Sequence, residues 1–212
     1  MRQLAVVLLL MAGTALAAGG SLSTLAEPDP ARAAAGVDRG WLAFSVPVRA
    51  GTRSPCCWQG QWNQPTTMEC RLQDEQHSHG TRQDSPLTAS VKFYAQLREG
   101  QVRQLLLAGP DCPVDAAGAQ VTELAAVDET ATLDWLESLA RSGRNDVDHQ
   151  AMYALAMVAG DELLFEIARD PGRPDELRRQ AFFWLAQSDS EATLERLTRL
   201  LTPEPGANPI PR

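Results

Sequence analysis

Residues 91–107 read VKFYAQLREGQVRQLLL, and apolar side chains alternate with polar ones on both sides of Glu99-Gly100. A period of two is typical of a strand with one buried face, so this stretch predicts two strands joined by a two-residue turn. Gly100 favours the turn because glycine tolerates the positive φ that such turns require. We therefore expect an antiparallel hairpin, in which Leu97 faces Val102 and Phe93 faces Leu106.

The same half of the chain carries another predicted strand, residues 41–48, and all four cysteines, which are Cys56, Cys57, Cys70 and Cys112. A bridge between the two adjacent cysteines would be strained, so two patterns remain, in which each of this pair joins either Cys70 or Cys112. Side chains of adjacent residues in a strand point to opposite faces, which predicts one bridge on each side of the sheet. A bridge that closes a loop of about fifteen residues contributes roughly 3 kcal/mol. We expect a disulfide-bonded β-rich domain over residues 39–118.

The amino terminus is built like a secretory signal peptide. Arg2 precedes nine apolar residues, 4–12, and Ala15 and Ala17 are small residues two positions apart. We expect residues 1–17 to be removed by cleavage after Ala17, because the apolar run is shorter than the roughly 20 residues that span a bilayer. An uncleaved membrane anchor is the alternative. Cleavage predicts a periplasmic or secreted protein without stable membrane insertion.

Two proline-containing segments are predicted to lack a fixed fold. Residues 18–38 contain two prolines and many small residues without apolar periodicity, and we expect a flexible tether there. Residues 202–212 contain four prolines, which stop a helix, so we expect a disordered tail.

The apolar period changes from that of strands to that of helices over residues 119–201. Apolar residues recur three and four positions apart in five segments: 128–141, 148–159, 162–169, 174–187 and 190–201. A shift of thirty residues brings Ala151 onto Ala181 and Leu155 onto Leu185. Such self-similarity is typical of a solenoid of helix pairs, in which each unit buries its apolar face against its neighbours. An ordinary helical bundle with chance matches is the alternative.

The best candidate for a repeat signature begins at Asp170, before a predicted helix that carries Leu177, Arg178, Ala181 and Leu185. This pattern resembles the HEAT repeat, where an Asp in the turn precedes a hydrophobic-Arg pair, an Ala and a Leu. The preceding unit has Asp148 in place of the Arg. Together with the signal peptide and the cysteines, the chain resembles exported bacterial proteins with a HEAT-like domain at the carboxyl end. The resemblance implies protein binding on a solenoid surface.

Residues able to carry chemistry are sparse. There is no Gly-x-Ser-x-Gly motif and no glycine-rich phosphate loop. His77 and His79 lie in a polar stretch that could bind zinc or copper, although a solvated loop is the simpler interpretation. His149 is interpreted as a polar residue at a helix start rather than a general base.

Two further clusters of side chains on the predicted helices have an ordinary structural interpretation. The carboxylates Asp161, Glu162 and Glu166 are interpreted as one solvated helix face. The aromatic residues of 182–184 cover more than one face of their helix, and we favour a role in the core over an exposed contact surface.

These observations predict an α+β protein, a small disulfide-stapled antiparallel sheet followed by a short HEAT-like α-solenoid. We expect a non-catalytic protein-binding or adaptor module of the bacterial cell envelope, with no catalytic residue, cofactor or metal. Its partner would be another envelope or exported protein. The net charge of −8 argues against nucleic acid, which is held by neutralising phosphates. The alternatives are a thiol-redox factor or other envelope enzyme that uses Cys56 or Cys57, and a purely structural component.

Overall fold

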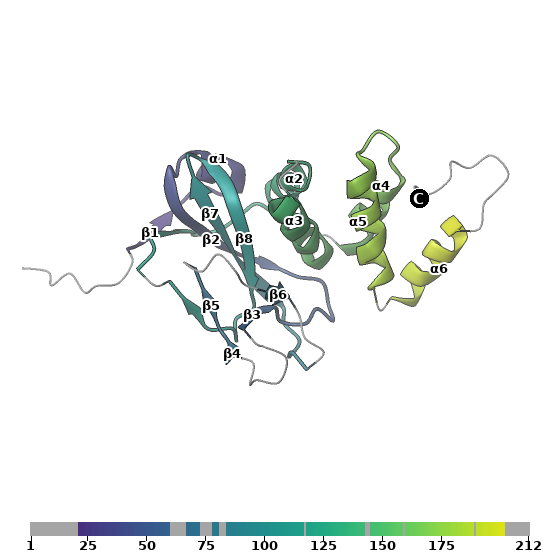
Figure 1. The fold of residues 1–212 in the computed structure, drawn as a ribbon, viewed down its shortest axis with the longest axis horizontal. Coiled ribbons are helices and arrows are strands. Elements are labelled where there is room, and N and C mark those ends of the chain that lie inside the picture. Colours follow the sequence, from purple (N-terminus) through teal and green to yellow (C-terminus); the bar gives the residue numbers. More distant parts are fainter. Residues whose placement is uncertain are drawn as a thin grey trace, which may run out of the picture.

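Figure 1 shows the computed structural model, which combines a β-rich part with a row of helices. It describes residues 21–59, 67–72, 78–80, 84–116, 118–142, 145–158, 160–188 and 190–201. The predicted signal peptide, the predicted tail and His77 lie outside the described residues.

The main sheet has five strands in the order β1-β10-β2-β7-β8. These strands are β1 (Leu22–Leu25), β2 (Arg39–Pro47), β7 (Ser90–Arg98), β8 (Gln101–Ala108) and β10 (Val121–Leu124). The expectation of an antiparallel sheet is wrong in part. Strands β2, β7 and β8 pair antiparallel, but β10 pairs parallel with both β1 and β2. The two strands that make the sheet mixed come from outside the expected domain of residues 39–118, and the sheet extends to Leu124.

Residues 21–38 are not the flexible tether that the sequence predicted. Besides β1, they contain α1 (Pro30–Ala35), in which Ala33 and Ala34 are buried. Asp29 caps this helix, because its Oδ1 accepts hydrogen bonds from the main-chain N–H groups of Ala31 at 2.9 Å and Arg32 at 3.2 Å. Proline fits the first helical position, where its missing N–H group is not needed. Both elements are too short to produce a visible apolar period.

The predicted hairpin is present, with one change of register. Glu99 and Gly100 have φ values of 57° and 67°, as a two-residue turn requires, and Leu97 pairs with Val102. A register shift between Gln96 and Leu97 leaves Arg103 as an extra residue in β8. This bulge explains why Phe93 pairs with Leu107 rather than with Leu106, because one inserted residue exchanges the two faces of a strand.

Both faces of the main sheet are covered. One face packs against helices through a set of buried side chains: Leu42, Phe44, Val46, Val91, Phe93, Ala95, Leu97, Val102, Leu105 and Leu107. The opposite face contributes Trp41, Ala43, Leu106, Ala108 and Val121, which pack against Cys57, Cys70 and Leu72. The protein therefore has three layers, and the cysteines belong to the layer opposite the helices.

The cysteine-containing layer consists of short strands. Three form a sheet in the order β4-β3-β6, and two pair as β5-β9. Their bounds are Cys56–Gln59 for β3, Thr67–Met68 for β4, Cys70–Arg71 for β5, Ser78–Gly80 for β6 and Val114–Asp115 for β9. In Figure 1 the labelled strands β3 to β6 lie together on one side of the main sheet.

All five predicted helices are present with small changes at their ends. They are α2 (Glu129–Ala140), α3 (Asn145–Val158), α4 (Gly160–Arg169), α5 (Asp175–Ala186) and α6 (Glu191–Leu201). In Figure 1 α2 and α3 lie beside the sheet, and α4, α5 and α6 follow in a row away from it. No helix among the described residues is long and apolar enough to cross a membrane.

The helices and the sheet share one core. Trp135 of α2 lies 5.8 Å from Phe44 of β2 between ring centroids. Gln150 of α3 accepts a hydrogen bond from the main-chain N–H group of Leu105 at 2.6 Å. Since β8 is an edge strand, this side chain satisfies a donor that would otherwise be available to another chain.

Candidate functional site

A cavity of about 760 Å³ lies where the loop after β2 meets the helical half. Its lining comes from residues 49–53, from the facing ends of α3 and α4, and from α5 and α6. This volume is within the range of about 300–1,000 Å³ that is typical of ligand pockets. The charged lining residues are Arg49, Arg53, Asp161, Glu162 and Arg196.

Asp161 ties three segments together at this cavity. Its Oδ1 accepts a hydrogen bond from Nη1 of Arg49 at 2.5 Å, which joins α4 to the loop after β2. Its Oδ2 accepts hydrogen bonds from Oγ of Ser188 at 2.9 Å and from Oγ1 of Thr193. The Asp161 side chain is only 17% exposed. It therefore does not belong to the solvated helix face that the sequence predicted, whereas the side chain of Glu162 is 76% exposed.

The local backbone explains how Asp161 reaches these partners. Gly160 begins α4 with a φ of 71°, a left-handed value that suits glycine and separates α4 from α3. Asp161 is in the first turn of α4, where a negative charge interacts favourably with the helix dipole. At α6 the hydroxyl of Ser190 accepts a hydrogen bond from the N–H group of Thr193 at 3.4 Å. Ser190 thus caps α6, and Ser188 is left to bind Asp161.

A second charged pair lies beside the first. Arg196 of α6 forms an ion pair with Glu162 of α4. Its guanidinium lies 4.0 Å from the ring centroid of Phe165, within the distance of a cation–π contact. Both contacts join α6 to α4, so Arg196 has a defined orientation at the cavity wall.

Aromatic side chains line the other side of the cavity and continue to the surface. Tyr153 of α3 and Trp184 of α5 have ring centroids 5.1 Å apart, and Phe183 lies 5.2 Å from Trp184. Phe182 and Trp184 are partly buried against the core, as the favoured interpretation of the sequence required. Phe183 is 57% exposed, so this part of the aromatic set is a surface feature.

The polar groups of the cavity include two hydroxyls, two carboxylates and three arginines that are held by contacts with one another or with the backbone. The Ser188 and Thr193 hydroxyls both donate to the Asp161 carboxylate, which directs their hydrogen atoms to the same oxygen. Among the described residues that line the cavity, none is a histidine or a cysteine. What remains is a preformed recess with fixed arginines and an aromatic wall.

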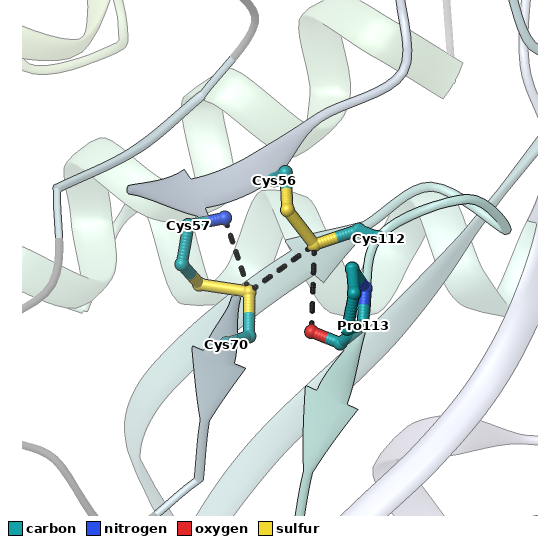
Figure 2. Close-up of a disulfide and its surroundings, with 5 residues drawn as sticks. All are labelled: Cys56, Cys57, Cys70, Cys112 and Pro113. Carbon is teal, nitrogen blue, oxygen red and sulfur yellow. Dashed lines mark hydrogen bonds between the residues drawn. A yellow bond between two sulfur atoms is a disulfide. The ribbon is translucent and has the colours of Figure 1, made fainter. Parts of the chain in front are cut away.

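The four cysteines form two disulfide bridges, Cys56–Cys112 and Cys57–Cys70 (Figure 2). This is one of the two patterns that the sequence left open. The expectation of one bridge on each side of a sheet is wrong, because Sγ of Cys70 and Sγ of Cys112 are 3.7 Å apart. Both bridges lie in the layer that covers one face of the main sheet, where they connect β3 to β5 and to the turn after β8.

The candidate repeat signature occupies structurally important positions at α5. Leu177, Ala181 and Leu185 are at most 3% exposed and belong to the common core. Nε of Arg178 donates a hydrogen bond at 3.3 Å to the carbonyl oxygen of Ala168, near the end of α4. Arg178 therefore provides a hydrogen-bond donor to a carbonyl group in the last turn of α4, where carbonyl groups lack a donor within the helix.

Asp170 orders the turn between α4 and α5. Its carboxylate accepts hydrogen bonds from the N–H group of Gly172 at 2.8 Å and from Nε of Arg173 at 3.1 Å. Arg173 also pairs with Glu137 of α2, so the turn is connected to the helix next to the sheet.

The two histidines in the described part of the chain, His79 and His149, are not among the residues that line the cavity. His149 is exposed in α3. His79 lies in β6, where its backbone pairs with that of Cys57. The three sulfur atoms of Cys56, Cys70 and Cys112 are within 4.8 Å of one another, but all are used in bridges.

Sequence reasoning did not find the cavity, because its lining comes from segments more than 100 residues apart, as the contact between Arg49 and Asp161 illustrates. No protein-family model matches the chain. A search of curated proteins and a search of solved structures also find no match.

Proposed function

We propose that this protein is a non-catalytic binding module of the cell envelope, which holds a segment of another envelope or exported protein in the cavity beside α3–α6. The observation that carries the proposal is the continuous aromatic run from exposed Phe183 through Trp184 to Tyr153 in the cavity wall. Tyrosine, tryptophan and arginine are the side chains that most often dominate binding energy at protein interfaces. Here they are held in place before any partner arrives.

The charges of the cavity favour a partner segment that combines an apolar side chain with a carboxylate. Three arginines and two carboxylates line the cavity, which leaves a local excess of positive charge in a chain with a net charge of −8. Asp161 already engages Arg49, and Glu162 engages Arg196. Nη1 of Arg53, by contrast, donates to a neutral group, the carbonyl oxygen of Ser85 at 2.9 Å, so Arg53 is the arginine most available to an anion. Arginine suits this role because its planar guanidinium binds carboxylates through two parallel hydrogen bonds.

We further propose that α3–α6 act as two HEAT-like units that present this surface. The thirty-residue offset between α3 and α5 supports this interpretation, as do the contacts of α3 with both α4 and α5 and of α5 with α6. Arg178 of α5, which donates to the end of α4, and Asp170 in the turn have the contacts expected of residues that fix one unit on the next.

Site-specific photo-crosslinking tests the binding proposal in cells that make the protein. A photo-reactive residue at position 183 is expected to yield one stoichiometric partner, and the same residue at position 22 is expected to yield none. Leu22 is a matched control because it is also exposed and apolar, at 69%, but lies in edge strand β1. Arg53→Glu should weaken the crosslink at position 183. The same partners at both positions, or none at 183, would contradict the proposal.

The alternative of a thiol-redox factor or another envelope enzyme at Cys56 or Cys57 requires a thiol. All four cysteines of the chain are bridged, so a reductant would first have to open one bridge. The binding proposal needs no such step, so it is tested on the protein with both bridges intact.

A further inference from the structure

The two disulfide bridges are in direct contact. Sγ of Cys70, in one bridge, lies 3.7 Å from Sγ of Cys112, in the other, close to the contact distance of two sulfur atoms. Figure 2 shows the four sulfur atoms as a continuous series from Cys57 through Cys70 and Cys112 to Cys56. A disulfide exchanges when a thiolate attacks one of its sulfur atoms, so two bridges in contact can exchange once one of them is reduced.

The bridges differ in their access to solvent. Cys57 and Cys70 are 0% and 1% exposed, which shields the Cys57–Cys70 bridge from any external thiol. Cys112 is partly buried in the turn after β8, where its N–H group donates to the carbonyl oxygen of Gly109. Cys56 is itself 3% exposed, so a reductant from solution reaches the Cys56–Cys112 bridge first and does so at Cys112.

The contact between the bridges selects one particular sulfur for attack. In Figure 2 the dashed line from Sγ of Cys112 ends at Sγ of Cys70 and not at Sγ of Cys57. The N–H group of Cys57 donates to Sγ of Cys70 at 3.1 Å, which holds the attacked sulfur in this position.

We propose that this sulfur cluster carries out an internal thiol–disulfide exchange that begins with a dithiol reductant. The reductant gives two electrons and two protons to the Cys56–Cys112 bridge and becomes a disulfide itself. The Cys112 thiol then releases its proton to solvent and the thiolate attacks Sγ of Cys70. The Cys70–Cys112 bond forms as the Cys57–Cys70 bond breaks, and Cys57 leaves as a thiolate and takes up a proton. This second step involves no net oxidation, and it leaves thiols on the adjacent residues Cys56 and Cys57.

The inference does not depend on the proposed binding function, because the cluster and the cavity share no residue. It assigns the chain a class of partner, a dithiol reductant that docks at the turn after β8. It also assigns the two bridges different roles: Cys56–Cys112 receives the electrons, and Cys57–Cys70 is reached only through Cys112.

Partial reduction of the unmodified protein tests the exchange. The protein is treated with less than one equivalent of dithiothreitol, quenched with acid, unfolded and alkylated, and the labelled and bridged peptides are identified by mass spectrometry. We expect a species with a Cys70–Cys112 bridge and labels on Cys56 and Cys57, which forms faster as the pH rises because the thiolate is the nucleophile. Partly reduced protein labelled only at Cys56 and Cys112 at every time and pH would overturn the proposal.

Two matched variants isolate the second step without a reductant. Cys56→Ser leaves Cys112 as the unpaired cysteine, and exchange should then move part of the label to Cys57. Cys112→Ser leaves Cys56 unpaired but removes the attacking sulfur, so its label should stay on Cys56. Circular dichroism verifies that both are folded. A folded Cys56→Ser protein with label on Cys112 alone would overturn the proposal, and the partial reduction decides if either variant does not fold.

Discussion

Replacing Asp161 by alanine is expected to destabilise the protein by about 3–4 kcal/mol. A hydrogen bond to a charged group contributes about 1.5–3 kcal/mol, and Asp161 accepts three, from Arg49, Ser188 and Thr193. The three are not additive because they share one carboxylate, so we expect the total to fall well below their sum. Ser188 and Thr193 are only 6% and 4% exposed and would lose an acceptor that water cannot easily replace, whereas Arg49 is 35% exposed and would be rehydrated.

Urea unfolding followed by circular dichroism measures this loss. For a chain of this size each 1 kcal/mol corresponds to about 2–4 °C in Tm, so the same variant should melt about 6–16 °C lower. Asp161→Asn keeps one acceptor oxygen and should lose about 1–2 kcal/mol. Glu162→Gln is the matched control, because this neighbouring carboxylate is 76% exposed and its ion pair should contribute less than about 1 kcal/mol.

The outcome bears on how the cavity is held open. A loss below about 1 kcal/mol for Asp161→Ala, or one no larger than that of Glu162→Gln, would refute the argument that buried contacts at this carboxylate join the loop after β2 to α4 and α6. A double-mutant cycle with Arg49→Met measures how much of the lost free energy of unfolding belongs to the pair of Asp161 and Arg49. If this pair accounts for the whole loss, the shared role of the Ser188 and Thr193 hydroxyls is refuted.

Three other changes have definite expected results. Glu99→Asn should stabilise the protein by a few tenths of a kcal/mol in urea unfolding, because Glu99 has a φ of 57° and asparagine tolerates this conformation better; a loss would contradict the turn geometry. Gln150→Leu should lower the free energy of unfolding by about 1–2 kcal/mol and increase aggregation measured by light scattering, since it removes the acceptor for an N–H group of edge strand β8. An unchanged free energy of unfolding and unchanged light scattering would contradict that role. In Tyr153→Phe the only tyrosine left is Tyr94, and absorbance at 295 nm reports its ionisation; its pKa should lie above 10 because burial and then the charge of Glu123 disfavour the anion. The free energy of unfolding should fall as the pH rises from about 10 through this pKa, because the unfolded chain releases that proton first. Titration at or below pH 10 would contradict the assignment.

The sequence predicted those elements whose period is long enough to be visible. Five helices and the β7-β8 hairpin were found because each repeats its apolar pattern over at least two turns or several alternations. The bulge at Arg103 was missed, because the insertion of one residue does not disturb the alternation on either side of it. Strand β1 and helix α1 were missed for a different reason: β1 forms by pairing with β10 and α1 packs against α2, and both partners are remote in sequence.

The candidate site was harder to predict than the fold. Asp161 and Glu162 are adjacent acidic residues at the start of one helix, and the sequence does not distinguish them. Their difference arises from the loop after β2, which brings Arg49 to one carboxylate and leaves the other in solvent. A buried carboxylate of this kind can be identified only when the segment that covers it is known.

The position of the cysteines follows from the need to cover both faces of the main sheet. After the bulge in β8, Leu105 and Leu107 face the helices, while Leu106 and Ala108 face the opposite side with Trp41 of β2. The layer on that side has strands of only two to four residues, too short to be stable by themselves. Its cover over Trp41 and Leu106 therefore depends on the two bridges, of which one joins β3 to β5 and the other joins β3 to the turn after β8. Exchange within the cluster would keep one bridge at all times, because the Cys70–Cys112 bond forms as the Cys57–Cys70 bond breaks, so the layer on this face of the sheet stays joined to the turn after β8.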